Sequence, residues 1–228
     1  MDHQTLWMLW LDIVQQAKDI KKYVHPELEK EKATDNLTIY RTVLVEKIEC
    51  FKSNLEQKYS ESILFYILFP LVSFCDEKVN LYLFNHMSLS KASWESLQTE
   101  FFQRRDGGEH FFRMIDAILA KEVKVPIVIP IQINLLLKEG FKGKYHLANQ
   151  YNITLYEKKL ETMIENESGC DVVNKGYENV LESLSIHQTL QSTKSRWSKR
   201  FLTKSYYISA AILGVAIVCS SYLFLILR

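Results

Sequence analysis

This sequence has few glycines, few prolines and almost no net charge. Its 228 residues include seven glycines and four prolines, the two residue types least compatible with a helix interior. This scarcity argues against a loop-rich or β-rich chain and favours a helical one. The formal net charge is only +1. Because nucleic-acid-binding domains usually carry a strongly basic surface, we expect no nucleic-acid partner.

Motifs for catalysis and metal binding are also missing. The six histidines form no HExxH or HxH pattern, and no GxSxG, Walker A or GxGxxG segment occurs. No CxxC pair occurs either, so we expect free thiols in a reducing compartment at Cys50, Cys75, Cys170 and Cys219. The sequence therefore predicts a protein that is not an enzyme and has no cofactor and no metal site.

A long apolar run occupies the C-terminal end of the chain. From Tyr206 to Leu227 there is no charged residue and no His, Asn, Gln or Pro. A helix of about 22 residues spans roughly 33 Å, which exceeds the ~30 Å hydrocarbon core of a bilayer. The alternative is a buried helix of a soluble domain, but such helices seldom contain so long an uncharged run. We therefore predict a membrane anchor at 206–227.

The charges beside this run predict its orientation. Only Arg228 follows the run, whereas five basic residues precede it: Lys194, Arg196, Lys199, Arg200 and Lys204. Because positive charges stay on the cytoplasmic side, we expect a single-pass, tail-anchored protein with its N-terminal region in the cytoplasm. The N-terminus also lacks the basic stretch of a signal peptide. The five basic residues are equally suited to contact anionic lipid headgroups or to act only as a topology signal.

The run also contains a pair of small residues, Ala210 and Gly214, at small-xxx-small spacing. Such a pair lets helices approach closely in lipid, and it favours a homo-oligomer or a partner helix at the anchor. The alternative is that these are ordinary small residues of a membrane span.

Apolar residues recur at helical spacing through most of the region before the anchor. We expect helices over about 6–25, 36–55, 61–80, 93–102, 109–121, 125–139 and 152–167, with a charged, exposed connection at 26–36. The third is apolar around most of its circumference and should be the most buried, with Pro70 as a site for a kink. Ser93 is the expected N-cap of the fourth. The β-branched residues at 125–139 also suit a strand, but an isolated strand would have no partner. The predicted fold class is all-α.

Two adjacent acids, Asp76 and Glu77, come at the expected end of the third helix. Buried carboxylates cost several kcal/mol unless they are paired, and neighbouring residues point ~100° apart on a helix. One interpretation is structural, with a helix cap or a salt bridge. The other is an acidic surface where a partner docks. The residues alone favour the structural interpretation.

Glycines and aromatic residues mark the expected turns and core. Gly107, Gly108, Gly140 and Gly143 are interpreted as turn and C-cap glycines rather than phosphate cradles, and Gly108 and Gly140 are expected to have positive φ. Core positions are predicted for four aromatic residues: Trp94, Phe111, Phe112 and Phe141.

Four features occur in an order that is typical of one family. They are an apolar helix that ends in Asp76-Glu77; Trp94, Leu97, Phe101 and Phe102; a Gly-Gly-Glu-x-Phe-Phe segment of Gly107, Gly108, Glu109, Phe111 and Phe112; and a Gly-Phe-x-Gly-x-Tyr segment of Gly140, Phe141, Gly143 and Tyr145. With the anchor, this set resembles the DotU/TssL (IcmH-like) proteins of bacterial type VI and type IVb secretion systems. The resemblance covers about residues 5–165 and the anchor.

The resemblance carries expectations about fold and partners. It implies two small helical bundles joined in a hook and an inner-membrane location. It also implies a partner of the TssM/IcmF type and recruitment of the baseplate, partly through a TssK-type subunit. The absence of a cell-wall-binding domain after the anchor is typical of the short form of the family. Because the family carries acids at this point and uses its cytoplasmic cleft for contacts, the resemblance favours the interpretation of Asp76 and Glu77 as a docking site for partners.

Some positions depart from the family pattern. This chain has Ile129, Pro130 and Ile131 where the family usually has Tyr and Leu, and His146 where Arg is common after the Tyr. Arg104-Arg105-Asp106 precedes the two glycines. These departures concern the detailed surface rather than the fold.

The sequence thus divides into three expected parts: a cytoplasmic helical domain at 1–167, a juxtamembrane stalk at 168–205 and the anchor at 206–227. Two other classes of protein stay open. A tether of the SNARE type would need a heptad repeat before the anchor, which the stalk lacks. A membrane-bound enzyme would need a catalytic site, and no such motif is found.

Overall fold

The computed structural model of the chain describes residues 3–86, 94–146 and 151–168. All of these residues belong to one unit, Met1–Tyr177. The part described is helical and contains no strand, as the all-α prediction requires. Its elements are α1 (His3–Lys18), η1 (Asp19–Lys22), α2 (Lys30–Glu56), α3 (Glu61–His86), α4 (Leu97–Phe102), α5 (Gly107–Leu119), α6 (Val128–Lys138), η3 (Gly143–Tyr145) and α7 (Tyr151–Ser168).

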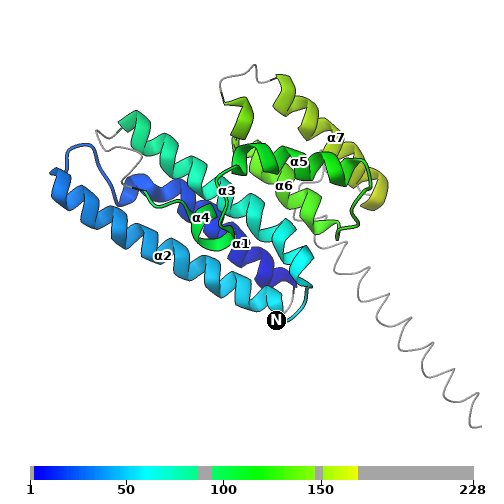
Figure 1. Cartoon of the computed structure of the whole chain (residues 1–228), viewed down its shortest axis with the longest axis horizontal. Helices are drawn as coiled ribbons and strands as arrows, with labels where there is room; N and C mark the ends of the chain where they lie inside the picture. The colour runs from blue at the N-terminus through cyan, green and yellow to red at the C-terminus, as the bar shows by residue number, and fades with distance from the viewer. Residues whose placement is uncertain (1–2, 87–93, 147–150, 169–228) are drawn as a thin grey trace, which may run out of the picture. The chain divides into compact units, whose positions relative to one another are not determined.

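Helices α1, α2 and α3 pack against one another in a first set (Figure 1). Each of α1 and α2 buries one stripe of apolar residues at helical spacing, with charged residues on the opposite face. The stripe of α1 includes Leu6, Trp10, Ile13, Val14 and Ala17, and that of α2 includes Leu37, Tyr40, Leu44, Ile48, Phe51 and Leu55.

Helix α3 belongs to both halves of the described part, because it contacts α1 and α2 as well as α5 and α6. Every residue from Ile67 to Asp76 is buried. This agrees with the prediction of a most buried helix that is apolar around its circumference. The helix continues through Pro70, so the proline does not end it.

Helices α5, α6 and α7 pack against one another in a second set (Figure 1). The ambiguous segment at 125–139 contains helix α6, Val128–Lys138, so the choice of a helix over a strand is confirmed. Its C-terminus is a Schellman motif, in which Gly140 N donates to Leu137 O at 2.8 Å and Phe141 N donates to Leu136 O at 3.0 Å. The expected C-cap glycine, Gly140, has a φ of +84°.

Three expected element boundaries are wrong. Helix α2 begins at Lys30 rather than near Asn36, because Ala33 extends its buried stripe while the charged neighbours of Ala33 face solvent. Helix α3 runs to His86, so Asp76 and Glu77 lie within the helix and not at its end. Helix α4 begins only at Leu97, with Ser96 at the N-cap, whereas Ser93 lies outside the described residues.

The glycine pair was also interpreted wrongly. Gly107 and Gly108 form the first turn of α5 after the N-cap residue Asp106, and neither has positive φ. A glycine is needed at position 108 for a different reason, because the backbone of Gly143 packs closely against it. A Cβ at Gly108 would lie 3.0 Å from the backbone carbon of Gly143.

Candidate functional site at Asp76, Glu77 and Lys78

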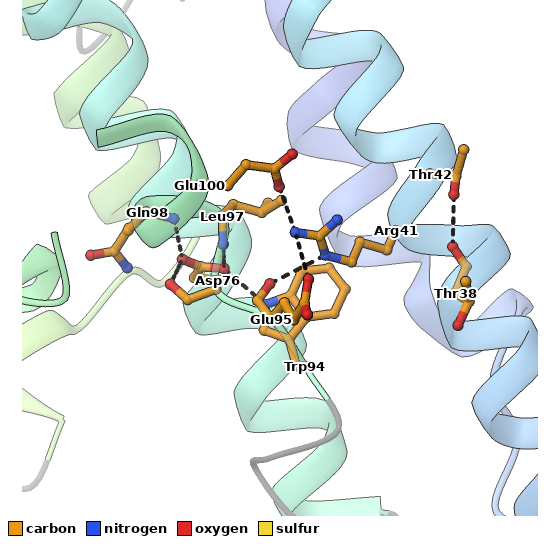
Figure 2. Close-up of polar contacts among 10 residues, drawn as sticks. Thr38, Arg41, Thr42, Asp76, Trp94, Glu95, Leu97, Gln98 and Glu100 are labelled. Atoms are coloured by element: carbon orange, nitrogen blue, oxygen red, sulfur yellow. Dashed lines mark hydrogen bonds and ion pairs between the residues drawn. The ribbon is translucent and has the colours of Figure 1, made fainter. Parts of the chain in front are cut away.

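Asp76 accepts four hydrogen bonds from the segment that leads into α4 (Figure 2). Trp94 Nε1 donates to Oδ1 at 2.8 Å, and Ser96 Oγ donates to Oδ2 at 2.7 Å. The amides of Leu97 and Gln98 each donate at 2.9 Å. These are the first two amides of α4, which have no partner within the helix. A carboxylate from another helix therefore does the work that an N-cap side chain usually does.

Burial makes these bonds important for stability. Asp76 is only 2% exposed, and a buried charge is tolerated only when it is hydrogen-bonded. Bonds to an ionised carboxylate are roughly twice as strong as neutral ones. The carboxylate of Asp76 thus fixes the segment 94–98 against α3.

Arg41 of α2 also binds the residues around the start of α4 (Figure 2). Its guanidinium lies 5.9 Å from the ring centroid of Trp94, and Nε donates to the carbonyl of Glu95 at 3.3 Å. The same guanidinium forms an ion pair with Glu100 of α4. Trp94 is therefore held between a buried acid and a cation.

Glu77 binds a different segment, the loop after α6. Its carboxylate accepts bonds from the amides of Lys142 at 2.8 Å and Gly143 at 2.6 Å. Burial raises the pKa of the Glu77 carboxyl above its ordinary value, although both donated bonds lower it. Gly143 has a φ of +48°, and a Cβ there would lie 2.7 Å from the carbonyl oxygen of Gly108. This loop therefore contacts both α3 and the N-terminus of α5.

Lys78 binds the start of the same loop. Its Nζ donates to the carbonyl of Glu139 at 2.7 Å and of Gly140 at 3.3 Å, at the C-terminus of α6. Burial lowers the pKa of the Lys78 ammonium, while the nearby carboxylates of Glu77 and Glu139 raise it. Lys18 of α1 adds an ion pair to the side chain of Glu139 at 2.6 Å. Three successive residues of α3 thus hold two loops in place.

The two later motifs of the sequence meet in one aromatic cluster. Phe111 and Phe141 have ring centroids 4.2 Å apart, and Phe112 lies 4.7 Å from Tyr145. Phe111, Phe112, Phe141 and Trp94 are all buried, whereas Glu109 is exposed. The structure thus brings the Gly-Gly-Glu-x-Phe-Phe and Gly-Phe-x-Gly-x-Tyr segments together. Trp94 lies elsewhere, between Asp76 and Arg41.

Sequence reasoning missed the polar partners of these motifs. Lys78 directly follows the two acids in the sequence, which could have drawn attention to it. The carbonyls that it binds, those of Glu139 and Gly140, are distant in sequence and could not have been named. A second missed cluster lies before α5. Arg104 and Arg113 each donate to Asp106 Oδ2 at 2.7 Å. The hydrogen bond from Arg104 lowers the pKa of Asp106 to about 2, against the opposing effect of burial.

The predicted membrane residues lie outside the described part. These are the anchor residues Tyr206, Ala210, Gly214 and Leu227 and the flank Lys194, Arg196, Lys199, Arg200 and Lys204. Among residues 3–86, 94–146 and 151–168, no helix is both long enough and apolar enough to span a bilayer. In the same part of the chain, no group of three or more His, Cys, Asp or Glu side chains is arranged to hold a metal ion.

Comparison with known proteins tests the resemblance directly. A family model described as type VI secretion system protein DotU matches residues 13–228. Among solved structures, the chain is similar to DotU from Francisella novicida, with 32% sequence identity and a TM-score of 0.59. That match covers 71% of this chain and 99% of the other. No curated protein matches the sequence. The prediction from the four ordered motifs is confirmed: this chain belongs to the DotU family of type VI secretion proteins.

Proposed function

We propose that this chain is a structural component of the inner-membrane complex of a type VI secretion system. The observation that carries the proposal is the family match across residues 13–228. The chain would bind a TssM/IcmF-type membrane protein and recruit baseplate components, among them a TssK-type subunit. A scaffold of this kind needs a stable surface and performs no chemical step.

The helical region supports this role because its two sets of helices share α3. Contacts at Asp76, Glu77 and Lys78 fix the segment 94–98 and the loop after α6 against α3, so that the exposed residues of both sets can act as one binding surface. In the proposed arrangement the two sets are the two bundles of a hook. The geometry supports a structural role for Asp76 rather than direct docking, since its carboxylate is buried and occupied by four donors.

We further propose that the chain crosses the membrane once, at 206–227, with the helical region in the cytoplasm. The uncharged span and the basic flank support this topology. A reporter fused after Arg228 should lie outside the cytoplasm, and one fused before Met1 should lie inside. A C-terminal reporter that is active in the cytoplasm would contradict the topology.

The same span is proposed to contact another helix through Ala210 and Gly214. Gly214→Leu should weaken self-association or partner association without preventing insertion, because the larger side chain keeps the helices apart. An association assay in bilayers measures this. Ala216→Leu is the matched control within the span, and equal association of both variants with the parent would contradict the contact.

A pull-down tests the proposed function as a whole. The tagged full chain is expressed in a bacterium that has a type VI system, and membranes are solubilised in mild detergent. A TssM/IcmF-type protein and a TssK-type protein should co-purify. A tagged chain that lacks residues 3–168 but keeps the anchor is the control, and it should lose the TssK-type protein. If neither protein is enriched over that control, the proposal is wrong.

A further inference from the structure

A groove of about 660 Å³ lies between the C-terminal end of α5 and helix α7. Figure 1 shows these two helices side by side in the second set. The apolar residues that line the groove are Leu119, Ala120 and Met163. Leu119 and Met163 are half-buried and Ala120 is exposed, so these three residues form a partly open apolar floor to the groove.

Three lysines also line the groove. They are Lys121 after α5, and Lys158 and Lys159 on α7. Within the part of the chain that the structure describes, none of them forms an ion pair, although Lys159 lies 5.9 Å from the ring of Tyr156. By contrast, Lys138 of the neighbouring α6 pairs with Glu161 at 2.7 Å. The lysines of the groove are thus available to an external anion.

Two acids also line the groove, Asp116 and Glu167. Asp116 accepts a hydrogen bond from the hydroxyl of Tyr156 at 3.2 Å, which partly satisfies its carboxylate. Three cations and two anions leave one positive charge in excess, with one cation just after α5 and two on α7.

The backbone at Lys121 supports a role for its side chain. Lys121 has a φ of +58° and follows the C-cap residue Ala120. Its amide donates to Ile118 O, and the amide of Glu122 donates to Ala117 O, both at 3.0 Å. This is a Schellman motif, in which glycine is usually found because a Cβ is penalised at positive φ. Replacing Lys121 by glycine should thus remove the charge without harming the fold.

We propose that this groove binds an acidic, amphipathic segment of a partner protein, with its apolar side chains on the floor and its carboxylates beside the lysines. A protein segment suits the groove better than a membrane does, because a segment can lie along the groove between the two helices and contact the half-buried Leu119 and Met163, whereas a flat headgroup layer would meet mainly the exposed rim. Peptide binding is measured on the isolated chain, so the result is independent of the secretion partners proposed above.

The test uses the full chain in nanodiscs of zwitterionic lipid and three labelled peptides of equal length. The first repeats Leu and Glu at helical spacing, the second replaces each Glu by Lys, and the third replaces each Leu by Ser. Fluorescence anisotropy, corrected with empty nanodiscs, gives the dissociation constants. The Leu/Glu peptide should bind at least about tenfold more tightly than either of the others, since both its charge and its apolar face are required.

Variants locate the binding. Lys158→Glu with Lys159→Glu should weaken the Leu/Glu peptide by about tenfold or more, and Lys121→Gly by several-fold, with the melting temperature unchanged or raised in Lys121→Gly. Lys58→Glu, an exposed lysine at the end of α2, is the matched control and should leave the affinity unchanged. Equal binding of all three peptides, or an unaltered affinity in the folded double variant, would overturn the proposal. Lysine-dependent binding to anionic vesicles, without peptide binding, would assign the groove to a lipid surface instead and would also overturn it.

Discussion

At the scale of single residues, the two adjacent acids of α3, Asp76 and Glu77, bind two different segments of the chain. Asp76 binds the first amides of α4 and the indole of Trp94, whereas Glu77 binds the amides of Lys142 and Gly143. Neighbouring residues of a helix point ~100° apart, so adjacent acids reach separate loops. The sequence alone favoured a structural role for the pair, and these contacts supply the partners that it could not name.

We predict that Asp76→Ala destabilises the helical region by about 3–5 kcal/mol, because four donors lose their acceptor inside the protein. Thermal unfolding of the full chain in mild detergent, followed by circular dichroism, measures the loss. Asp12→Ala is the matched control. Asp12 is more exposed and pairs with Lys47 on the surface, so its removal should cost less than about 1 kcal/mol.

The same experiment separates the structural account from direct docking. Partner capture and melting temperature are measured together on Asp76→Lys with Glu77→Lys. A collapsed melt means that the carboxylates hold the fold. Lost capture with an unchanged melt would instead support a docking surface and contradict the structural role.

At the scale of elements, apolar periodicity predicted the helices but not the contacts that begin and end them. The stripes of α1 and α2 and the apolar circumference of α3 are visible in the sequence because burial selects residues at fixed spacing. The start of α4 was missed, since its cap comes from Asp76, twenty-one residues before Leu97. No local pattern encodes a cap of that kind.

The glycines show the same limit. Gly140 was expected to have positive φ as the C-cap glycine of the helix before it, and it does. Gly108 was expected to share this conformation but is helical, and it is small because the backbone of Gly143 lies against it. A contact between segments thirty-five residues apart cannot be read from either segment alone.

We predict that Gly143→Ala destabilises the protein by about 2 kcal/mol or more, because φ is +48° and the new Cβ would meet the carbonyl oxygen of Gly108 at 2.7 Å. Gly140→Ala is the matched comparison. Its φ is also positive, but the nearest atom to a new Cβ is a side-chain atom, the Nζ of Lys78, at the longer distance of 3.3 Å, so the cost should be about 1 kcal/mol. Denaturant unfolding of both variants gives the order, and a larger loss at Gly140 would contradict this account.

At the scale of the whole described region, α3 is the element through which the two sets of helices depend on each other. It contacts α1 and α2 as well as α5 and α6, and its residues at 76–78 bind the segment 94–98 and the loop after α6. Separate bundles joined by a linker would unfold independently. A shared buried helix couples them, so that neither set keeps its core when the other unfolds.

Tryptophan fluorescence can test this coupling, because the tryptophans of the described region lie in the first set or pack against it. Trp7 and Trp10 lie on α1, and Trp94 lies 6.2 Å from Tyr40 of α2. Trp197 lies outside the described residues and is replaced by phenylalanine in the background used for the measurement. Fluorescence then reports on the first set, whereas far-UV circular dichroism reports on all helices.

We predict that Phe112→Ala, a change confined to the second set, lowers the fluorescence midpoint as much as the circular dichroism midpoint. The ring of Phe112 is fully buried against Phe141, Tyr145 and Tyr156. Its truncation should cost about 3–5 kcal/mol, or on the order of 10 °C in melting temperature. Phe112→Leu, which keeps most of the apolar volume, should shift both midpoints less. Two separate transitions, with the fluorescence midpoint unmoved, would show that the sets unfold independently and that α3 does not couple them.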